Sequence, residues 1–257
     1  MKKNRTDYYI ESIKRATQIL KSFTANEKEF GVTELSKKLN LHKSTIHRIL
    51  ITLEDEGFLV KNKLTQKYSL GIKLFELGHI LQNQIEVRSV ALPIMKELAK
   101  KTGESIDLNI VSDNKRISIE KIESSQDIRK IIQIGKILPL YCGGSGKALL
   151  AHLPEENIDT YIKETKLEKL GPNTITDPDK LKEHLKQIKN DGYAISFEER
   201  ITGSVSIGAP IFDYTRNVIA SISVSGPISR FPKDKIQLYI SLVKEETLKI
   251  SSLMGFY

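Results

Sequence analysis

The sequence predicts an α+β protein in which a small helical segment precedes a larger domain built on a mostly antiparallel sheet. Residues 1–70 carry 14 Lys and Arg against 8 Asp and Glu, a net charge of +6, whereas residues 71–257 carry only +2 of the total +8. Of the 15 glycines, only Gly31 and Gly57 precede residue 71. Apolar residues follow helical spacing up to residue 56 and alternate with polar residues after residue 104. These shifts predict short helices first and a turn-rich mixed fold afterwards.

Composition excludes several classes of protein. With 39% hydrophobic residues the chain can form a packed core, and its one cysteine, Cys142, cannot form an internal disulfide. No run of 18 apolar residues is present, and no apolar signal core follows the polar stretch 1–7. We therefore expect a soluble, cytoplasmic protein with no membrane partner.

The first 70 residues predict three helices and a hairpin. Helices are expected at 10–24, 33–39 and 43–56, with Thr33 as an N-cap and Gly57 as a C-terminal cap. The buried stripe of the third helix would be Ile46, Ile49, Leu50 and Leu53. Short strands at 58–60 and 68–70 follow it. This order is that of a winged helix-turn-helix.

The exposed side of the third helix indicates what this domain binds. Its donors gather at the N-terminal end, which a recognition helix points into the major groove: Lys43, Ser44, Thr45, His47 and Arg48. Lys61, Lys63 and Lys67 would lie on the wing, near a phosphate backbone. A solvated helix face is the simpler alternative, and an RNA-binding or scaffolding module is another. The element order, the cations at the helix end and the charge asymmetry together favour double-stranded DNA.

The connector after residue 71 is apolar at positions 72, 74, 75, 77, 80 and 81. This stripe is too broad for a free surface helix, so it must pack against its own domain or against the same helix of a second subunit. A homodimer is favoured, because two-fold proteins read two half-sites.

The rest of the chain predicts an irregular mixture of helices and strands. Helices are expected at 90–102, 144–152, 154–165, 178–190 and 234–253, and Asp177-Pro178 is typical of an N-cap followed by Pro at the first helical position. Strands are expected at 105–111, 116–122, 128–134, 192–198, 204–212 and 217–225, several of them with one polar face.

Two polar motifs stand out in this second part. Gly143-Gly144-Ser145-Gly146-Lys147 is not a phosphate loop, because Tyr141 and Ala148 replace required residues, but it could form an anion-binding turn or a simple capped turn. Ser204 and Ser206, like Ser223 and Ser225, share a strand face and could line a small polar cavity.

Catalytic chemistry finds little support in the residues. An enzyme would depend on Cys142 or Glu198, and neither has an identifiable base partner or cofactor motif. Glu198-Glu199 is more typical of one exposed and one capping carboxylate, and His152 and His184 of surface positions. No metal-ligand spacing is present. We therefore expect no enzyme, no cofactor and no metal.

In these motifs the chain resembles the IclR-type bacterial transcription regulators over nearly its whole length. The matching stretches are Thr33 to Ser36, Leu41 to Leu50, Gly57-Phe58, Leu138-Pro139, Gly146 to Ala151, Gly192 to Ala194, Glu198-Glu199, Ala209 to Ile211 and Ser223 to Pro227.

The resemblance implies a winged helix-turn-helix DNA-binding domain at 1–71, a linker helix at 72–88 and a GAF-like effector-binding domain at 89–257. It also implies dimers, often dimers of dimers, on palindromic operators, with repression favoured over activation. Thr33 joins the DNA-contacting residues. The effector is expected to be a small organic acid held by Leu138, Gly144, Ser145, Ser196, Ser204, Ser206, Ser223 and Ser225.

Two departures from the family pattern affect the ligand. Ser196 stands where the family often has Asp or Asn, and Tyr141-Cys142 where it has a small residue or His. The identity of the effector therefore does not carry over. The serines suit a hydroxylated or carboxylated metabolite, such as a sugar acid, better than an apolar aromatic compound.

Overall fold

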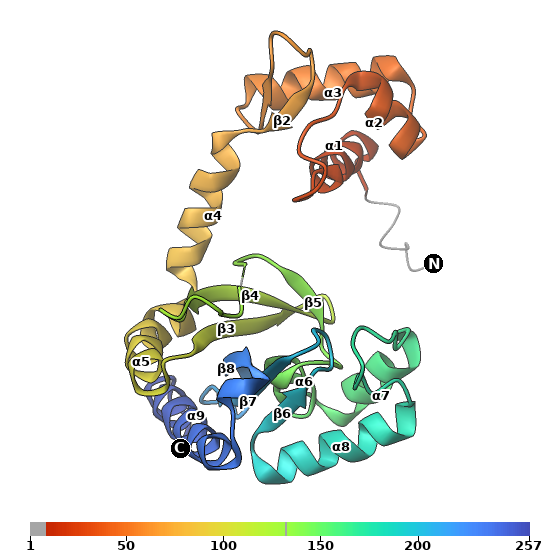
Figure 1. Ribbon diagram of the computed structural model, residues 1–257. Helices are drawn as coiled ribbons and strands as arrows, with labels where there is room; N and C mark the ends of the chain where they lie inside the picture. Colours follow the sequence, from red (N-terminus) through yellow and green to blue (C-terminus); the bar gives the residue numbers. More distant parts are fainter. Residues whose placement is uncertain (1–8, 132) are drawn as a thin grey trace. The chain divides into compact units, whose positions relative to one another are not determined.

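The structure, a computed structural model, describes residues 9–131 and 133–257. The chain divides into two compact units, Met1–Gln84 and Ile85–Tyr257 (Figure 1). Within the described ranges, no helix combines the length and the apolar character that crossing a bilayer requires. The polar stretch 1–7 lies outside the described residues.

The first unit has the winged helix-turn-helix order that the sequence predicts. Helices α1 (Glu11–Ser22), α2 (Val32–Leu39) and α3 (Lys43–Asp55) precede the antiparallel strands β1 (Leu59–Lys61) and β2 (Tyr68–Leu70). Phe30 forms a further bridge to Tyr68, with N–H···O distances of 2.9 and 2.8 Å, and so ties the start of α2 to the wing. The core of the unit consists of Ile19, Phe23, Phe30, Leu35, Ile46, Leu50, Leu59 and Tyr68.

Helix ends in this unit confirm one predicted cap and correct another. Thr33 is not the N-cap of α2: the helix begins two residues earlier from Gly31, whose N–H donates to Glu34 Oε2 at 2.7 Å. The Glu34 carboxylate thus satisfies the N–H of the N-cap residue, which is the glutamate half of a capping box. Gly57 has φ +74° after α3, and Phe58 N–H donates to Leu53 O at 2.8 Å. This is the left-handed termination that glycine allows.

The connector contains two helices rather than one. Helix α4 spans Ile72–Gln84, Ile85 has an extended backbone, and α5 spans Glu86–Thr102. The predicted linker helix 72–88 therefore breaks at Ile85. On α4, Ile72 is 71% exposed and Leu81 60% exposed, so the apolar stripe of this helix faces outward.

The second unit is built on an antiparallel sheet in the order β5-β4-β3-β8-β7-β6. Its strands are β3 (Ser105–Ser112), β4 (Lys115–Ile122), β5 (Ile137–Pro139), β6 (Ala194–Phe197), β7 (Ser204–Phe212) and β8 (Val218–Pro227). One face is apolar and packs on α5 and on α9 (Lys233–Leu253), as Figure 1 shows. The predicted α+β architecture is confirmed.

The opposite face carries the remaining helices. These are α6 (Gly144–Leu150), α7 (Glu155–Glu164) and α8 (Pro178–Asp191), and they share a second apolar core. Asp177 Oδ1 accepts from Lys180 N–H at 2.9 Å with Pro178 at the first helical position, which confirms the predicted cap. A 3-10 turn (Ile228–Arg230) joins β8 to the segment before α9.

The predicted strand at 128–134 is wrong. Residues 128–131, 133 and 134 form an irregular connection, residue 132 lies outside the described residues, and the strand begins later, at Ile137. The edge of β4 pairs instead with Ile137–Pro139, while the segment before residue 132 is tied to β3 by side chains. Ile128 and Ile131 are 73% and 72% exposed, so the apolar alternation that suggested a strand is not satisfied by burial.

Candidate nucleic-acid interface and buried polar site

The start of α3 presents a row of polar and basic side chains to solvent. Lys43, Ser44, His47 and Arg48 are exposed and Thr45 is half-buried, while Ile46 and Leu50 anchor the helix to the core. Among the described residues, neither Lys43 nor Arg48 takes part in an ion pair. Lys38, by contrast, pairs with Glu27. The two cations at the start of α3 are thus available for an external anion.

The wing adds a second basic segment. Asn62 Oδ1 accepts from the N–H groups of Leu64 and Thr65 at 2.9 and 3.2 Å and so shapes the turn between β1 and β2. Lys63 is exposed on this turn, and Lys61 Nζ lies 5.5 Å from the centre of the Tyr68 ring. Lys67 differs, because it pairs with Glu34 at 2.8 Å and so braces the wing against α2.

The face of the sheet that looks toward α6 is lined by polar side chains, and most of them are buried. Strand pairing places Ser105, Ser225 and Ser206 side by side, and sets Asp107 opposite Ser223. We call the following residues the polar cluster: Ser105, Asp107, Asn109, Arg116, Ser118, Ser145, Ser196, Ser206, Ser221, Ser223 and Ser225, all of them buried.

The glycine-rich turn before α6 closes onto this face. Gly144 N–H donates to Ser206 Oγ at 2.9 Å, and Gly143 N–H donates to Glu199 Oε2 at 2.9 Å. A Cβ atom on Gly144 would lie 2.8 Å from Ser206 O, so only glycine permits this approach. The N–H groups of Gly143 and Gly144 are therefore occupied by protein acceptors, which favours the capped-turn interpretation at these two positions.

Arg116 enters the cluster from β4. Its Nη1 donates to Ser145 Oγ, and Leu138, half-buried on β5, is its strand partner and lies on the same face. Within the described part of the chain, three buried polar atoms have no hydrogen-bond partner: Arg116 Nε, Ser118 Oγ and Ser225 Oγ. Buried polar atoms are normally paired, so these three mark where a bound molecule could supply partners.

The structure brings most of the predicted effector residues to this one face. Ser196 is buried opposite Ser206, Ser223 Oγ donates to Asp107, and Ser221 Oγ donates to Ser145 O at 3.1 Å. Ser204 is different. It lies half-buried at the start of β7, and its hydroxyl donates to Ile201 O at 2.7 Å.

Charged residues of this site were missed from the sequence. Asp107 and Arg116 are buried in strands whose polar positions were expected to face solvent, and Lys130 and Arg200 lie on connections. The burial of Asp107 could have been expected, because it stands between Ile106 and Leu108 in a strand too apolar for an exposed sheet. Nothing local marked Lys130 or Arg200, because tertiary folding alone brings their segments together.

The candidates for catalysis have structural roles. Cys142 is fully buried, and burial raises the pKa of its thiol. Glu198 accepts from Gly203 N–H at 2.6 Å, while Glu199 is buried and caps the turn before α6. His152 is half-buried rather than a surface residue, with its ring stacked edge-on against Phe212. Over the described residues, no group of three or more His, Cys, Asp or Glu could hold a metal ion.

Two family models match the chain. The model of the IclR helix-turn-helix domain matches residues 12–63, and that of the C-terminal domain of the bacterial transcriptional regulator IclR matches residues 79–252. The regulator KipR of Bacillus subtilis is 36% identical over 225 residues, which cover 88% of this chain and 90% of KipR. The transcriptional repressor AllR of Escherichia coli is 31% identical over 95% of this chain and 90% of its own.

Solved structures share the fold. The IclR protein of Thermotoga maritima superposes with a TM-score of 0.76 at 32% identity, covering 96% of this chain and all of the other. An IclR homologue of Microbacterium hydrocarbonoxydans, complexed with 4-hydroxybenzoate, gives a TM-score of 0.82 at 23% identity, over 94% of this chain and 98% of the other. These family models and relatives describe transcriptional regulators, not enzymes.

Proposed function

Because the chain belongs to the IclR family of DNA-binding transcriptional regulators, we propose that it is a repressor whose affinity for a palindromic operator is controlled by a small organic acid. The observation that carries the DNA-binding part is the exposure of the cations Lys43 and Arg48 at the start of α3, where neither forms an ion pair with any described residue. Repression is favoured over activation because AllR, a relative over most of the chain, is itself a repressor.

In this proposal α3 enters the major groove and the wing follows the phosphate backbone. The residues assigned to DNA are Thr33, Lys43, Ser44, Thr45, His47, Arg48, Lys61 and Lys63. Arginine and lysine suit guanine edges and phosphates, and hydroxyl groups suit either. Thr33 is exposed in the first turn of α2, the helix that crosses the backbone in this class of domain.

A homodimer, paired further into a dimer of dimers, fits a palindromic operator. The proposal places the dimer contact on α4, where Ile72, Ile80 and Leu81 are each more than half exposed. Exposed apolar area of this kind on one helix is typical of a protein interface. The functional division remains 1–71 for DNA, 72–88 for the linker and 89–257 for the effector, working on the chromosome in the cytoplasm.

The effector would bind at the polar cluster, near Leu138, Gly144, Ser145, Ser196, Ser204, Ser206, Ser223 and Ser225. The Ser225 and Ser118 hydroxyls are buried without a hydrogen-bond partner among the described residues. Together with the other serines of the polar cluster, they support a ligand rich in oxygen, such as a sugar acid. Binding would shift the packing of the linker 72–88, which contains α4 and the start of α5, and so change the spacing of the two recognition helices. Such a switch requires the ligand to bind more tightly to one spacing than to the other.

The DNA-binding part is tested by selecting bound fragments from the genome and measuring their affinity by fluorescence anisotropy. We expect a palindromic site and a loss of at least about tenfold in affinity for Arg48→Ala. Lys166→Ala, which removes an exposed lysine of the second unit, is the matched control. Equal affinity of all three proteins for the selected site would overturn the assignment of α3.

The effector part is tested separately. Sugar acids and aromatic acids are titrated calorimetrically into the full chain, and each acid that binds is added to the operator complex. Tight binding of the aromatic acids alone would overturn the preference for sugar acids. A protein truncated after residue 88 should bind the operator without responding to the acid, and an equal response would refute the switch.

A further inference from the structure

We propose that Lys130 contacts the effector, and that this effector is a hydroxylated dicarboxylic acid with one carboxylate against Arg116 and the other against Lys130. The inference rests on the proposed function, because it takes the polar cluster as the effector site. It adds a residue outside the predicted set and narrows the ligand from an acid to a diacid.

The charge balance of the site supports a dianion. Other charges of this unit are already paired, such as Lys147 with Glu199 and Arg230 with Glu104. Among the described residues, Arg116, Arg200 and Lys130 form no ion pair, and they lie close enough to act electrostatically on one another and to feel the charge of Asp107. Asp107 offsets one of them, so the site has two positive charges in excess. Arg116 is buried and Lys130 and Arg200 are partly buried, so unbalanced charge here is costly and an anionic ligand would relieve that cost.

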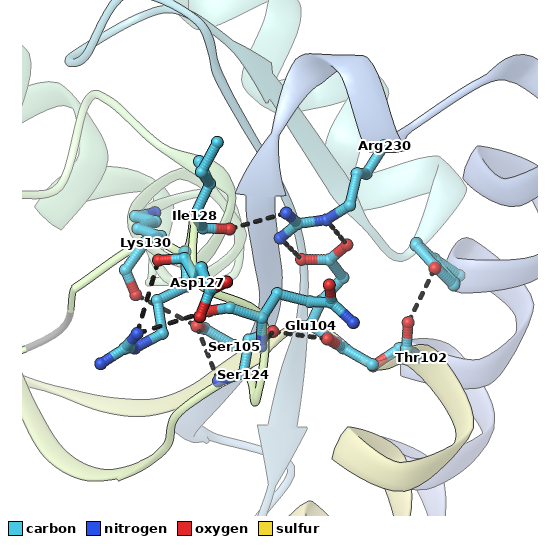
Figure 2. Close-up of polar contacts among 12 residues, drawn as sticks. Thr102, Glu104, Ser105, Ser124, Asp127, Ile128, Lys130 and Arg230 are labelled. Atoms are coloured by element: carbon cyan, nitrogen blue, oxygen red, sulfur yellow. Dashed lines mark hydrogen bonds and ion pairs between the residues drawn. The ribbon is translucent and has the colours of Figure 1, made fainter.

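Lys130 is held over the sheet by a set of specific contacts. Arg230 donates to both oxygens of the buried Glu104 carboxylate at 2.6 Å, and its third nitrogen donates to Ile128 O at 2.6 Å (Figure 2). Ser105 Oγ donates to Lys130 O at 3.1 Å and accepts from Ser124 N–H at 3.2 Å. The connection that carries Lys130 is thus fixed at two points.

The same strands carry hydroxyl groups that lack partners. Ser225 pairs in register with Ser105, whose hydroxyl holds the Lys130 backbone, and Ser225 Oγ is buried without a partner among the described residues. Ser118 Oγ and Arg116 Nε are unpartnered on β4. A ligand with carboxylates at its ends and hydroxyl groups between them would supply both kinds of partner.

The environment of Lys130 makes it responsive to such a ligand. Burial of its ammonium group lowers its pKa from 10.5 to about 8, against the attraction of Asp107 and with help from the repulsion of Arg116 and Arg200. The Cys142 thiol, whose pKa is raised by burial, remains protonated near pH 8. A carboxylate beside Lys130 favours its charged form, so the ligand should bind together with a proton.

Matched sugar acids provide the test. Glucarate and gluconate share a six-carbon hydroxylated chain and differ in the second carboxylate, as do galactarate and galactonate. In calorimetric titrations of the full chain we expect each diacid to bind at least about tenfold more tightly than its monoacid. In Lys130→Met the ratio should fall below about threefold. Lys130→Arg should retain the preference, and so should Lys136→Met, which removes an exposed lysine from the same connection.

Proton uptake gives a second readout that a merely structural role would not move. At pH 8 about half of Lys130 is protonated, so diacid binding should take up as much as about 0.5 proton per site. Titrations in buffers of different ionisation enthalpy measure this uptake, which Lys130→Met should remove and Lys136→Met should keep. Thermal unfolding of each variant checks that it is folded.

The outcomes separate the two proposals. Monoacids that bind as tightly as diacids, or a preference that survives Lys130→Met in the folded variant, would overturn the role of Lys130 and leave an organic-acid effector in place. Binding of aromatic acids with no binding of any sugar acid would overturn the effector class itself.

Discussion

Lys147 on α6 and Glu199 in the connection after β6 form an ion pair that is buried on both sides. Lys147 has no exposed surface, and its Nζ also donates to Ile195 O at 2.9 Å. Glu199 accepts in addition from Gly143 N–H. The pair therefore fixes the glycine turn to the edge of the sheet, next to the polar cluster. Burial lowers the pKa of Lys147, an effect that the charge of Glu199 opposes.

Breaking this pair on one side should be more damaging than removing it. Lys147→Met leaves the Glu199 carboxylate buried without its cation, and we expect a loss of about 3–5 kcal/mol in the free energy of unfolding. The double variant Lys147→Met/Glu199→Gln removes both charges of this pair and should recover a large part of that loss. Urea denaturation measures both, and a single variant as stable as the parent chain would contradict the prediction.

Lys63 on the wing should act through its charge alone. Removing one phosphate contact weakens binding equally on specific and random DNA and reduces the slope of log affinity against log salt by about 0.9. We therefore expect Lys63→Ala to show a flatter salt dependence with unchanged sequence preference. Lys67→Ala provides a comparison, because Lys67 is already paired with Glu34. A steeper slope for Lys63→Ala, or a changed sequence preference, would show that the wing is used differently.

The α4 interface can be tested with one charge. Leu81 is 60% exposed, and Leu81→Glu would bury a carboxylate in the proposed dimer contact. The dimer dissociation constant should rise at least about tenfold, as sedimentation equilibrium would measure. Leu64, 95% exposed on the wing, receives the same change as a control and should leave assembly unaltered. A dimer equally tight in both variants would exclude Leu81 from the contact.

Stability should fall as the solution is acidified below about pH 7. Burial lowers the pKa of His152 below its usual 6.5, and that of His184 as well. The unfolded chain takes up these protons near pH 6.5 while the folded chain does not, so the folded state loses stability between 6.5 and the lowered pKa values. His152→Gln should reduce the difference between urea midpoints at pH 7.5 and pH 5.5. A difference as large as that of the parent chain would show that His152 has no part in it.

The contacts of Arg230 should control the connection that carries Lys130. Arg230→Met removes the partner of the buried Glu104 and the anchor of Ile128, so stability should fall by about 2–3 kcal/mol. Trypsin should then cleave faster after Arg129 and Lys130. Arg230→Lys keeps the charge but cannot bind both oxygens of Glu104 at once. Its stability and its rate of cleavage should therefore lie between those of the parent chain and of Arg230→Met. Cleavage of Arg230→Met at the rate of the parent chain would show that other contacts hold this segment.

Much of the fold could be predicted because local chemistry specifies it. Gly57 and the Asp177-Pro178 pair mark helix ends through backbone requirements that hold in any surroundings. Thr33 misled because the N-cap residue of α2 is Gly31, whose N–H is satisfied by the Glu34 carboxylate. The stretch 128–134 misled because Ile128 and Ile131 are neither strand-paired nor buried. Side chains of Ser105 and Arg230, which are distant in sequence, hold the part before residue 132.

The site was predicted in part for the same reason. Serines spaced by two residues reveal a shared strand face, and the structure places Ser206, Ser223 and Ser225 on it. The charges of the site come from separate segments that approach only in the folded chain. In a strand that alternates polar and apolar residues, the polar residues are expected to face solvent. The alternation does not reveal that α6 covers this face of the sheet. Asp107 is nevertheless buried.

The alternation of β3, β7 and β8 has a consequence for how such a receptor can diversify. Ile106, Ile207 and Val224 point into the core under α5 and α9, while their immediate neighbours line the opposite face. Residues of the apolar core and residues of the proposed effector site thus occupy alternate positions in the same strands. A library randomised at positions 196 and 225 would therefore leave the apolar core unchanged, whereas changes at Ser206 and Ser223 would also remove hydrogen bonds to Gly144 and Asp107.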